Sequence, residues 1–348
     1  MSGTSLDGVD GVLVDFSGGF PEIVSHHFIA YPRRLRKDLL DLQHPGEDEL
    51  SRSAVLSIEL SGIYAEVANH LSSNGRVRAI GCHGQTVRHR PDLGYTIQLV
   101  NAPLLVELTE LTVVHDFRSR DIAAGGQGAP LVPAFHRVTF GHPAIHRAVL
   151  NLGGIANITD LPASDPATGY DCGPANMLMD AWIGRHLGFD YDDRGKWAST
   201  GRVLPVLLDA LLADEYFSLP PPKSTGRDRF NLEWLDSHLS GKEKPEDVQA
   251  TLLELTAATA ADSLRETGAE EVYLCGGGAK NLALRARLEK LLPGMKLSET
   301  GELGMEAGHI EAAAFAWLAR QAIEGLPGNL PEVTGAKGYR ILGAICPA

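Results

Sequence analysis

The residue best placed for chemistry in this sequence is an aspartate set among glycines. Asp171 lies in the segment GYDCGP, residues 169–174, shortly after the segment NLGGIANIT, residues 151–159. Because Gly153 and Gly154 lack side chains, they allow a tight turn and let backbone N–H groups approach a ligand. A carboxylate held in a glycine-lined turn can accept a proton from a reacting group. We therefore expect Asp171 to act as a general base.

Regular elements on both sides must position this aspartate. The stretch 147–152 (RAVLNL) is mostly apolar and predicts a short buried strand. Pro174 suits the first position of a helix, which we expect to end before Gly188. Asp171 then lies just ahead of a helix N-terminus, where the helix dipole and free N–H groups favour the ionised carboxylate.

Composition excludes several classes of protein. A chain of 348 residues with 44% hydrophobic content can bury one large core or the cores of two domains. A net charge of −13 and a pI near 5.4 argue against a nucleic-acid partner. No apolar run suits a membrane span and no signal-peptide pattern opens the chain. The cysteines are far apart and without metal-ligand spacing (Cys82, Cys172, Cys275 and Cys346). We expect a reduced, cytoplasmic protein that binds neither nucleic acid nor membrane.

Two further glycine turns accompany predicted strands. The turn 2–8 precedes a strand expected at 12–16, and it could hold phosphate oxygens or be an ordinary disordered N-terminus. The strand expected at 271–275 (EVYLC) runs into a glycine triplet and then a helix expected over 282–292. Strand, glycine turn and helix in this order favour contact with a nucleotide. Because the turns are spread over the whole chain, they predict two domains that both contact the nucleotide.

Three polar segments allow more than one interpretation. His83, in the segment GCHGQTV, could be a general base or a ligand, although a structural histidine is commoner. The stretch 116–121 (DFRSRD) is too dense in charge for a core and could be a solvated ion-pair cluster or a site for an anionic substrate. The stretch 222–231 (PKSTGRDRFN) could be a surface loop or an anion-contacting loop. The glycines and prolines of 125–133 are typical of a hinge and mark the best domain boundary.

Eight segments, in order, resemble the anhydro-N-acetylmuramic acid kinase family, and the match covers almost the entire chain. They are MSGTSLDGVD, GCHGQTV, DFRSRDIAAGGQGAPLVPAFH, NLGGIANIT, YDCGPANMLMDAW, PKSTGRDRFN, LCGGGAKN and LPGNLPEVTGA. The resemblance implies an α/β fold with two ribonuclease-H-like domains around a deep nucleotide and sugar cleft, as in sugar kinases, heat-shock chaperones and actin. We expect domain I to comprise residues 1–122 and 328–348, with the first phosphate loop. Domain II should comprise 123–327, with the second phosphate loop, the catalytic aspartate and the adenosine turn.

The family's reaction is implied along with its fold. Its members use ATP and Mg²⁺ to open the ring of 1,6-anhydro-N-acetylmuramic acid with water and to phosphorylate the 6-oxygen. The product is N-acetylmuramic acid 6-phosphate, within peptidoglycan recycling. A kinase of another amino sugar and a nucleotide-switched, actin-like binding protein are the alternatives. Asp171 and Glu311 favour the enzyme because a switch needs neither. The expected partners are these small molecules, and a homodimer stays open.

The resemblance also assigns roles to single residues. Asp171 falls on the family's catalytic aspartate, and Glu311, Arg120 and His83 would bind the sugar. A magnesium ion would be contacted through water by Asp7 or Asp10. The positions expected to bind ATP are Gly3, Thr4, Ser5, Leu6, Asp7, Gly8, Val9, Asp10, Asn151, Gly153, Gly154, Asn157, Gly276, Gly277 and Gly278.

The sequence departs from the family pattern at three positions. Met1 stands inside the first motif, whereas family members carry a short apolar strand ahead of it, so we expect such an extension to strengthen ATP binding. Ala175 replaces the family's usual glycine, which removes backbone freedom at the helix entry. Ser119 interrupts a run of three arginines and is expected to weaken anion contacts.

Overall fold

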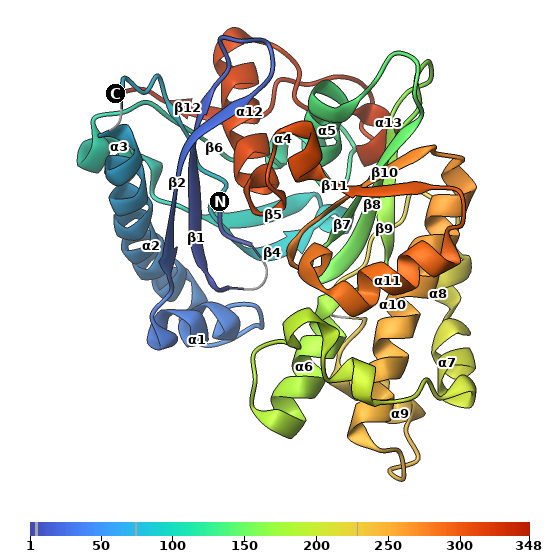
Figure 1. Cartoon of the computed structure of the whole chain (residues 1–348). Helices are drawn as coiled ribbons and strands as arrows, with labels where there is room; N and C mark the ends of the chain where they lie inside the picture. Colours follow the sequence, from blue (N-terminus) through green and yellow to red (C-terminus); the bar gives the residue numbers. More distant parts are fainter. Residues whose placement is uncertain (4–5, 74, 228) are drawn as a thin grey trace. The chain divides into compact units, whose positions relative to one another are not determined.

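A computed structural model describes residues 1–3, 6–73, 75–227 and 229–348 (Figure 1). The chain forms two compact units, each with its own core of buried apolar side chains. The first unit comprises Met1–Thr139 and His309–Ala348, and the second comprises Phe140–Gly308. The predicted mixed α/β class is confirmed, because both units combine sheets with packed helices.

The second unit is built on a sheet with the strand order β11-β10-β7-β8-β9. Its strands are β7 (Arg147–Leu152), β8 (Ile155–Leu161), β9 (Thr168–Pro174), β10 (Glu271–Cys275) and β11 (Lys296–Glu299). The first three pair antiparallel, whereas β10 runs parallel to β7 and β11 parallel to β10. Three antiparallel strands at one edge and two parallel strands at the other form the arrangement expected of a ribonuclease-H-like domain.

Helices connect and cover this sheet. They are α6 (Asn176–Leu187), α7 (Pro205–Leu212), α8 (Glu215–Ser218), α9 (Leu232–His238), α10 (Pro245–Thr267) and α11 (Leu282–Leu291). Helix α10 packs against β7, β8 and β9, and its alanine, leucine and threonine side chains are almost all buried. It begins with Pro245, which suits a first helical position, and ends at Gly268 with φ +72°, a left-handed conformation that glycine adopts readily. The sheet therefore buries one face under α10.

The first unit contains several small sheets. Strand β1 (Gly8–Asp15) pairs antiparallel with β2 (Glu22–Ala30), and β4 (Gln85–Arg90) pairs antiparallel with β5 (Tyr95–Leu99). Strand β6 (Val113–His115) lies between β3 (Ile80–Gly81) and β12 (Ala344–Cys346). The helices are α1 (Arg33–Asp41), α2 (Glu49–Ser72), α3 (Ala102–Thr109), α4 (Ser119–Ala123), α5 (Val132–Phe140), α12 (Ile310–Glu324) and α13 (Pro331–Thr334). Because α2 and α12 both pack against β1, they tie the N-terminal and C-terminal parts of the unit together.

Most of the predicted elements exist, with one change beside the aspartate. The strands expected at 147–152 and 271–275 are β7 and β10 with the predicted bounds, and α11 covers the predicted helix. Pro174, however, ends strand β9 and does not begin a helix. Helix α6 starts at Asn176, because Pro174 pairs with Ile155 at the sheet edge, where a residue without an N–H group is tolerated.

The chain passes from the first unit to the second between residues 139 and 140, and it returns between residues 308 and 309. We expected these boundaries at 122/123 and 327/328. Backbone hydrogen bonds explain the difference at the glycine-rich stretch. The Gln127 N–H donates to the Thr334 carbonyl at 2.8 Å, and the Lys337 N–H donates to the Ala124 carbonyl at 2.9 Å. Helix α12 also packs against β1 and β3. The glycine-rich stretch and α12 therefore both lie inside the first unit.

Candidate active site

Three polar residues form one row across the sheet of the second unit. Asn151 of β7 pairs with Asn157 of β8, and Asn157 pairs in turn with Asp171 of β9. Directly opposed residues on neighbouring antiparallel strands present their side chains to the same face of a sheet. The neighbouring residues Leu150 and Leu152 belong to the core on the other face. The fold thus groups three of the predicted site residues on the face opposite α10.

The Asp171 side chain is half-buried, and one of its two carboxylate oxygens is held by a hydrogen bond. Its Oδ2 accepts a hydrogen bond from the Thr225 N–H at 2.9 Å, whereas Oδ1 has no hydrogen-bond partner within the described ranges. Burial raises the pKa of Asp171 to about 6, with the Thr225 N–H acting in the opposite direction. A carboxylate with a pKa near 6 and one unoccupied oxygen suits proton acceptance near neutral pH.

The expected effect of a helix N-terminus on Asp171 was wrong. The residue lies within β9, and the N–H groups at the start of α6 are occupied by the glycine turn between β7 and β8. The Asn176 N–H donates to the Gly153 carbonyl at 3.0 Å, and the Ala175 and Met177 N–H groups donate to the Gly154 carbonyl at 3.0 and 3.2 Å. Burial therefore decides the pKa, and it favours the protonated form.

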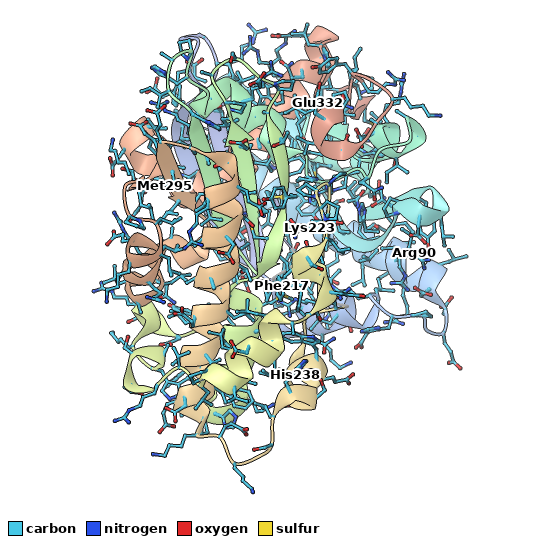
Figure 2. The ribbon with its side chains drawn as sticks, turned by 90° about the vertical axis from the view of Figure 1, so that its right-hand side faces the viewer. Arg90, Phe217, Lys223, His238, Met295 and Glu332 are labelled. Carbon is cyan, nitrogen blue, oxygen red and sulfur yellow. The ribbon has the colours of Figure 1, made fainter. Side chains whose placement is uncertain are left out.

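A loop covers the edge of β9 beside Asp171. The Asp171 N–H donates to the Lys223 carbonyl at 3.1 Å, and the Tyr216 hydroxyl donates to the Asp171 carbonyl at 2.7 Å. The Lys223 ammonium donates to the carbonyls of Tyr216 and Phe217, both at 3.3 Å, and lies 5.0 Å from the centre of the Tyr216 ring. Figure 2 labels Lys223 and Phe217. The stretch 222–231 is therefore a structured loop that holds the aspartate backbone.

The second and third glycine turns meet at the ends of the parallel strands β7 and β10. Cys275 pairs with Asn151, so the next residue, Gly276, lies beside the end of β7. Its φ is +76°. A methyl group on Gly276 would lie 2.4 Å from the Asn151 side-chain oxygen, and one on Gly278 would lie 2.7 Å from the Leu152 Cβ. These two glycines are required by packing.

Other glycines of the site have open space in front of them. A methyl group on Gly277 would meet nothing closer than the Asn176 amide nitrogen at 3.8 Å. One on Gly154 would have the Met177 Cβ at 3.7 Å as its nearest neighbour. Both are ordinary van der Waals distances, so the fold itself does not require glycine here. A ligand that lies close to the backbone would require it.

The predicted N-terminal phosphate loop lies in the first unit, and Thr4 and Ser5 lie outside the described residues. Leu6 and Val9 are buried in the core, and Gly8 and Val9 already belong to β1. The loop is attached to the segment GCHGQTV, since the Ser2 hydroxyl donates to the Gly84 carbonyl at 3.2 Å. The Gln85 amide donates to the Gly3 carbonyl at 3.2 Å. Two motifs far apart in sequence therefore adjoin.

The two aspartates expected near a metal have different environments. Asp10 Oδ1 lies 2.5 Å from His26 Nε2, whereas Asp7 is 61% exposed and lies 3.8 Å from the Arg36 guanidinium. The described residues contain no group of three or more His, Cys, Asp and Glu side chains that could hold a metal ion. A magnesium ion bound mainly by phosphates and water needs only one or two carboxylates, so either aspartate fits that kind of contact.

The residues expected to bind the sugar differ in their contacts. His83 is buried, and its Nε2 lies 2.9 Å from Nη2 of Arg118. Burial and the Arg118 charge hold the pKa of His83 well below its usual value, so its ring is neutral. Burial lowers the pKa of Arg118 to about 10, with Glu311 acting in the opposite direction. Arg120 is exposed. Arg118, which we did not name as a site residue, is thus the arginine beside His83.

The charged stretch 116–121 is not solvated throughout, although its density of charge was compatible with a solvated ion-pair cluster. Asp121 is fully buried. Its Oδ2 accepts from the Gly128 N–H, and its Oδ1 accepts from the Asn329 amide and the Thr334 hydroxyl, all at 2.8 Å. A methyl group on Gly126 would lie 2.2 Å from Asp121 Oδ2. Asp121 therefore joins the glycine-rich stretch to the C-terminal segment.

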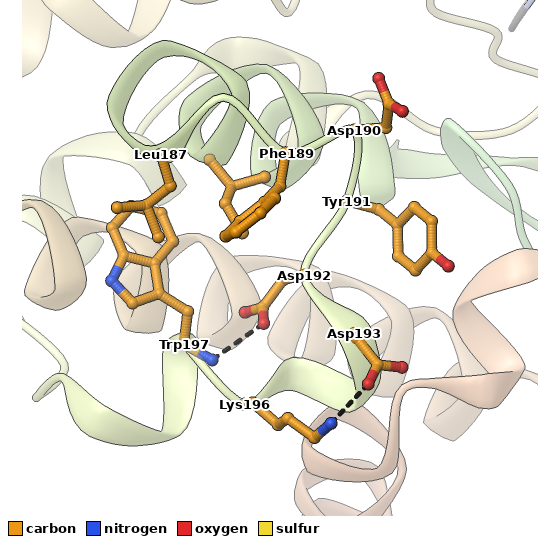
Figure 3. A pocket seen from close by; sticks show the side chains of 9 residues that line it. Leu187, Phe189, Asp190, Tyr191, Asp192, Asp193, Lys196 and Trp197 are labelled. Atoms are coloured by element: carbon orange, nitrogen blue, oxygen red, sulfur yellow. Dashed lines mark hydrogen bonds and ion pairs between the residues drawn. The ribbon is translucent and has the colours of Figure 1, made fainter.

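A pocket of about 430 Å³ lies beyond the end of α6 (Figure 3). Its lining includes Phe189, Tyr191 and Trp197, together with an ion pair between Lys196 and Asp193. None of the predicted site residues lines it. We therefore do not assign it to the active site.

Sequence reasoning missed several residues that adjoin the predicted ones. Asn176 donates its side-chain amide to the Leu152 carbonyl at 2.9 Å and so fixes the turn beside Gly278. Thr225 and Tyr216 contact Asp171 directly. Asn176 stands in the segment YDCGPANMLMDAW and Thr225 in PKSTGRDRFN, so the family segments contained a signal for both. Tyr216 lies outside these segments.

The whole chain, residues 1–348, matches the family model described as Anhydro-N-acetylmuramic acid kinase. The chain belongs to the anhydro-N-acetylmuramic acid kinase family. The anhydro-N-acetylmuramic acid kinase of Nitrosomonas europaea is 57% identical, over 100% of this chain and 98% of that protein. Those of Nitrosospira multiformis and Pseudomonas fluorescens are 56% and 50% identical, with the same coverage. Membership at this identity makes the chain an ATP-using anhydro-N-acetylmuramic acid kinase.

Solved structures outside this kinase family are much more distant. A ROK family glucokinase from Streptomyces griseus, in complex with glucose and AMPPNP, has a TM-score of 0.41 at 15% identity, over 90% of this chain and 99% of that one. The activator of the 2-hydroxyisocaproyl-CoA dehydratase from Clostridium difficile, with bound ADPNP, has a TM-score of 0.40 at 13% identity, over 89% and 93%. Among the described residues of this kinase, no helix is long and apolar enough to cross a membrane.

Proposed function

We propose that this kinase opens 1,6-anhydro-N-acetylmuramic acid with water and phosphorylates its 6-oxygen, with Asp171 as the general base. The observation that carries the proposal is the Asp171 carboxylate, which is half-buried in the polar row of the sheet and has one oxygen without a hydrogen-bond partner among the described residues. The product would be N-acetylmuramic acid 6-phosphate, for peptidoglycan recycling. A cytoplasmic location follows from the need for ATP, and the cysteines are free thiols.

The chemistry of the substrate explains the need for a base. In a 1,6-anhydro sugar the 6-oxygen is bonded to the anomeric carbon and carries no proton, so it cannot be phosphorylated until that bond breaks. Asp171 would take one proton from water while the water oxygen bonds to the anomeric carbon. The bond from that carbon to the 6-oxygen then breaks, and the 6-oxygen takes the γ-phosphoryl group as ADP leaves.

We propose that Asn151, Gly153, Gly154, Asn157 and the triplet 276–278 contact ATP in the second unit. The open space in front of Gly154 and Gly277 supports this, because backbone N–H groups there can approach phosphate oxygens or the nucleoside.

In the first unit, the segment 3–10 remains a proposed phosphate contact. It would act through backbone groups and not through the side chains of Leu6 and Val9, which are buried. His83, Arg120 and Glu311 remain proposed sugar contacts. Asp7 or Asp10 would hold Mg²⁺ through water, and the ion would neutralise phosphate charge.

Isotope labelling tests this function. The purified kinase is given ATP and the anhydro sugar in ¹⁸O-labelled water, and the phosphorylated product is analysed at early times, before its anomeric oxygen exchanges. We expect one ¹⁸O at the anomeric carbon and ADP in equal amount. The matched control is N-acetylmuramic acid, which already carries a 6-hydroxyl. Unlabelled product, or faster turnover of the control sugar, would contradict the proposal.

The pKa of Asp171 predicts the pH dependence of activity. Because burial raises this pKa to about 6, the carboxyl becomes protonated as the pH falls below 6 and can no longer accept a proton. We expect kcat/KM to fall about tenfold per pH unit below this pKa and to level off above pH 7. The measurement is a pH profile at saturating ATP. An acid limb near pH 4, the ordinary range for aspartate, would show that the pKa of the base is not raised in the working enzyme.

A glycine substitution tests the nucleotide contact. Gly277→Ala should fold normally, because its methyl group has open space, but that group would occupy the position where the ligand approaches the backbone. We expect the KM for ATP to rise about tenfold, equivalent to about 1.4 kcal/mol. The control is Gly62→Ala in helix α2, whose methyl group would meet nothing within 4 Å and should leave this KM unchanged. An unchanged KM in both variants would remove Gly277 from the site.

A further inference from the structure

The hydroxyl group of Thr225 is buried and has no hydrogen-bond partner in the described part of the chain. The N–H group of the same residue donates to Asp171 Oδ2 at 2.9 Å. The hydroxyl is therefore within a few ångströms of the carboxylate, and the second carboxylate oxygen has no partner among the described residues either. Buried hydroxyl groups are nearly always hydrogen-bonded, so an unpartnered one beside a base needs an explanation.

The backbone around Thr225 is fixed by the fold. On one side the Asp171 N–H holds the Lys223 carbonyl at 3.1 Å. On the other side the Gly226 carbonyl accepts the N–H groups of Arg229 and Phe230 at 3.2 and 3.1 Å. Arg229 is in turn paired with Asp214 at 2.6 Å. The loop therefore brings the Thr225 hydroxyl to the carboxylate in a defined place.

We propose that Thr225 is a positioning residue that holds the attacking water against Asp171. This inference rests on the proposed function of Asp171. A threonine hydroxyl has two acceptor lone pairs and one donor, so its oxygen can accept one hydrogen of the water while Asp171 Oδ1 accepts the other. The water oxygen then keeps a lone pair for the anomeric carbon. The proton facing Asp171 is transferred to the carboxylate, and the proton facing Thr225 stays on the oxygen as part of the new anomeric hydroxyl.

Two substitutions at Thr225 separate the effect of the hydroxyl group from the effect of the side-chain shape. Thr225→Val keeps the volume and the N–H bond to Asp171, and Thr225→Ser keeps the hydroxyl. We expect Thr225→Val to lower kcat by about ten- to a hundredfold, the equivalent of one hydrogen bond in the reacting state, with both KM values unchanged. Thr225→Ser should restore most of kcat. Ser224→Ala, at the exposed neighbouring residue, is the matched control and should match the unsubstituted kinase.

The outcomes are distinguishable from failure of the base itself. A normal kcat for Thr225→Val, with Asp171→Asn inactive, would overturn the role of Thr225 and leave the base in place. A serine variant as slow as the valine variant would show that the methyl group matters and not the hydroxyl, which also overturns it. A higher KM for the sugar with normal kcat would make Thr225 a substrate contact, contrary to the proposal. An active Asp171→Asn would instead overturn the proposed function.

Discussion

Replacing Asp171 with asparagine should lower turnover by at least two orders of magnitude, about 10²-fold or more, while leaving the folded protein intact. An asparagine oxygen can still accept the Thr225 N–H bond that Asp171 Oδ2 accepts at 2.9 Å, so the loop stays in place. The proton acceptor is lost, and removal of a general base costs about 10²- to 10⁴-fold in kcat. Single-turnover measurement of ADP formation tests this, with nucleotide affinity measured by calorimetry as the control. A folded variant with near-normal turnover would exclude Asp171 as the base.

The same variant should be more stable at pH 8. The folded-state pKa of Asp171, about 6, is above the ordinary aspartate value of 3.8. The stability contribution of this group is therefore present below pH 4, is lost as the pH rises to about 6, and stays lost above it. A difference of about two between the pKa values corresponds to about 3 kcal/mol, an upper bound on the gain. Thermal unfolding at pH 8 measures the gain, and a variant less stable than the native chain would contradict it.

Replacing Asp121 with alanine should destabilise the first unit strongly. The change removes a shared acceptor from three buried donors: the Gly128 N–H, the Asn329 amide and the Thr334 hydroxyl. The Asn329 amide and the Thr334 hydroxyl would keep only their carbonyl acceptors, Gly338 and Leu330. Breaking a buried charged network in this way costs about 3–5 kcal/mol, and the expected fall in Tm is roughly 10 °C or more.

The neighbouring arginine gives a matched control for this prediction. Arg120 is exposed and lies in the same helix α4, so Arg120→Ala should change the stability by no more than about 0.5 kcal/mol. Calorimetry or circular dichroism compares the two variants. If Asp121→Ala unfolded within about 2 °C of the native chain, the buried network would not hold the glycine-rich stretch.

Local patterns were enough to predict two strands of the second unit and the glycine turns that follow them. Apolar runs that end in glycine gave β7 and β10 with their observed bounds. The row from Asn151 to Asp171 could not be predicted, because it depends on the register of three strands and on an irregularity between Ala156 and Asn157. Register follows from long-range pairing and not from the composition of any one strand.

Burial accounts for most of what the sequence did not reveal. The density of charge in 116–121 suggested solvent exposure, yet Asp121 is buried because donors from distant segments meet it. We expected the ionised form of Asp171 to be favoured, whereas burial raises its pKa. This burial depends on the loop that contains Lys223 and Thr225, which contacts Asp171 at the edge of β9. The family resemblance named Arg120 as a site residue, whereas the arginine that contacts His83 is Arg118. Such partners are set by tertiary structure.

The glycine turn between β7 and β8 also links the proposed phosphate site to one residue, Asn176, through its side-chain amide and its backbone N–H group. Asn176 donates its side-chain amide to the Leu152 carbonyl and its N–H to the Gly153 carbonyl. These carbonyls belong to the same two peptide groups as the N–H groups of Gly153 and Gly154. Hydrogen bonds in series polarise one another. A phosphate oxygen bound at either N–H would make the matching carbonyl a stronger acceptor, so nucleotide binding would strengthen the hydrogen bonds that hold the first turn of α6.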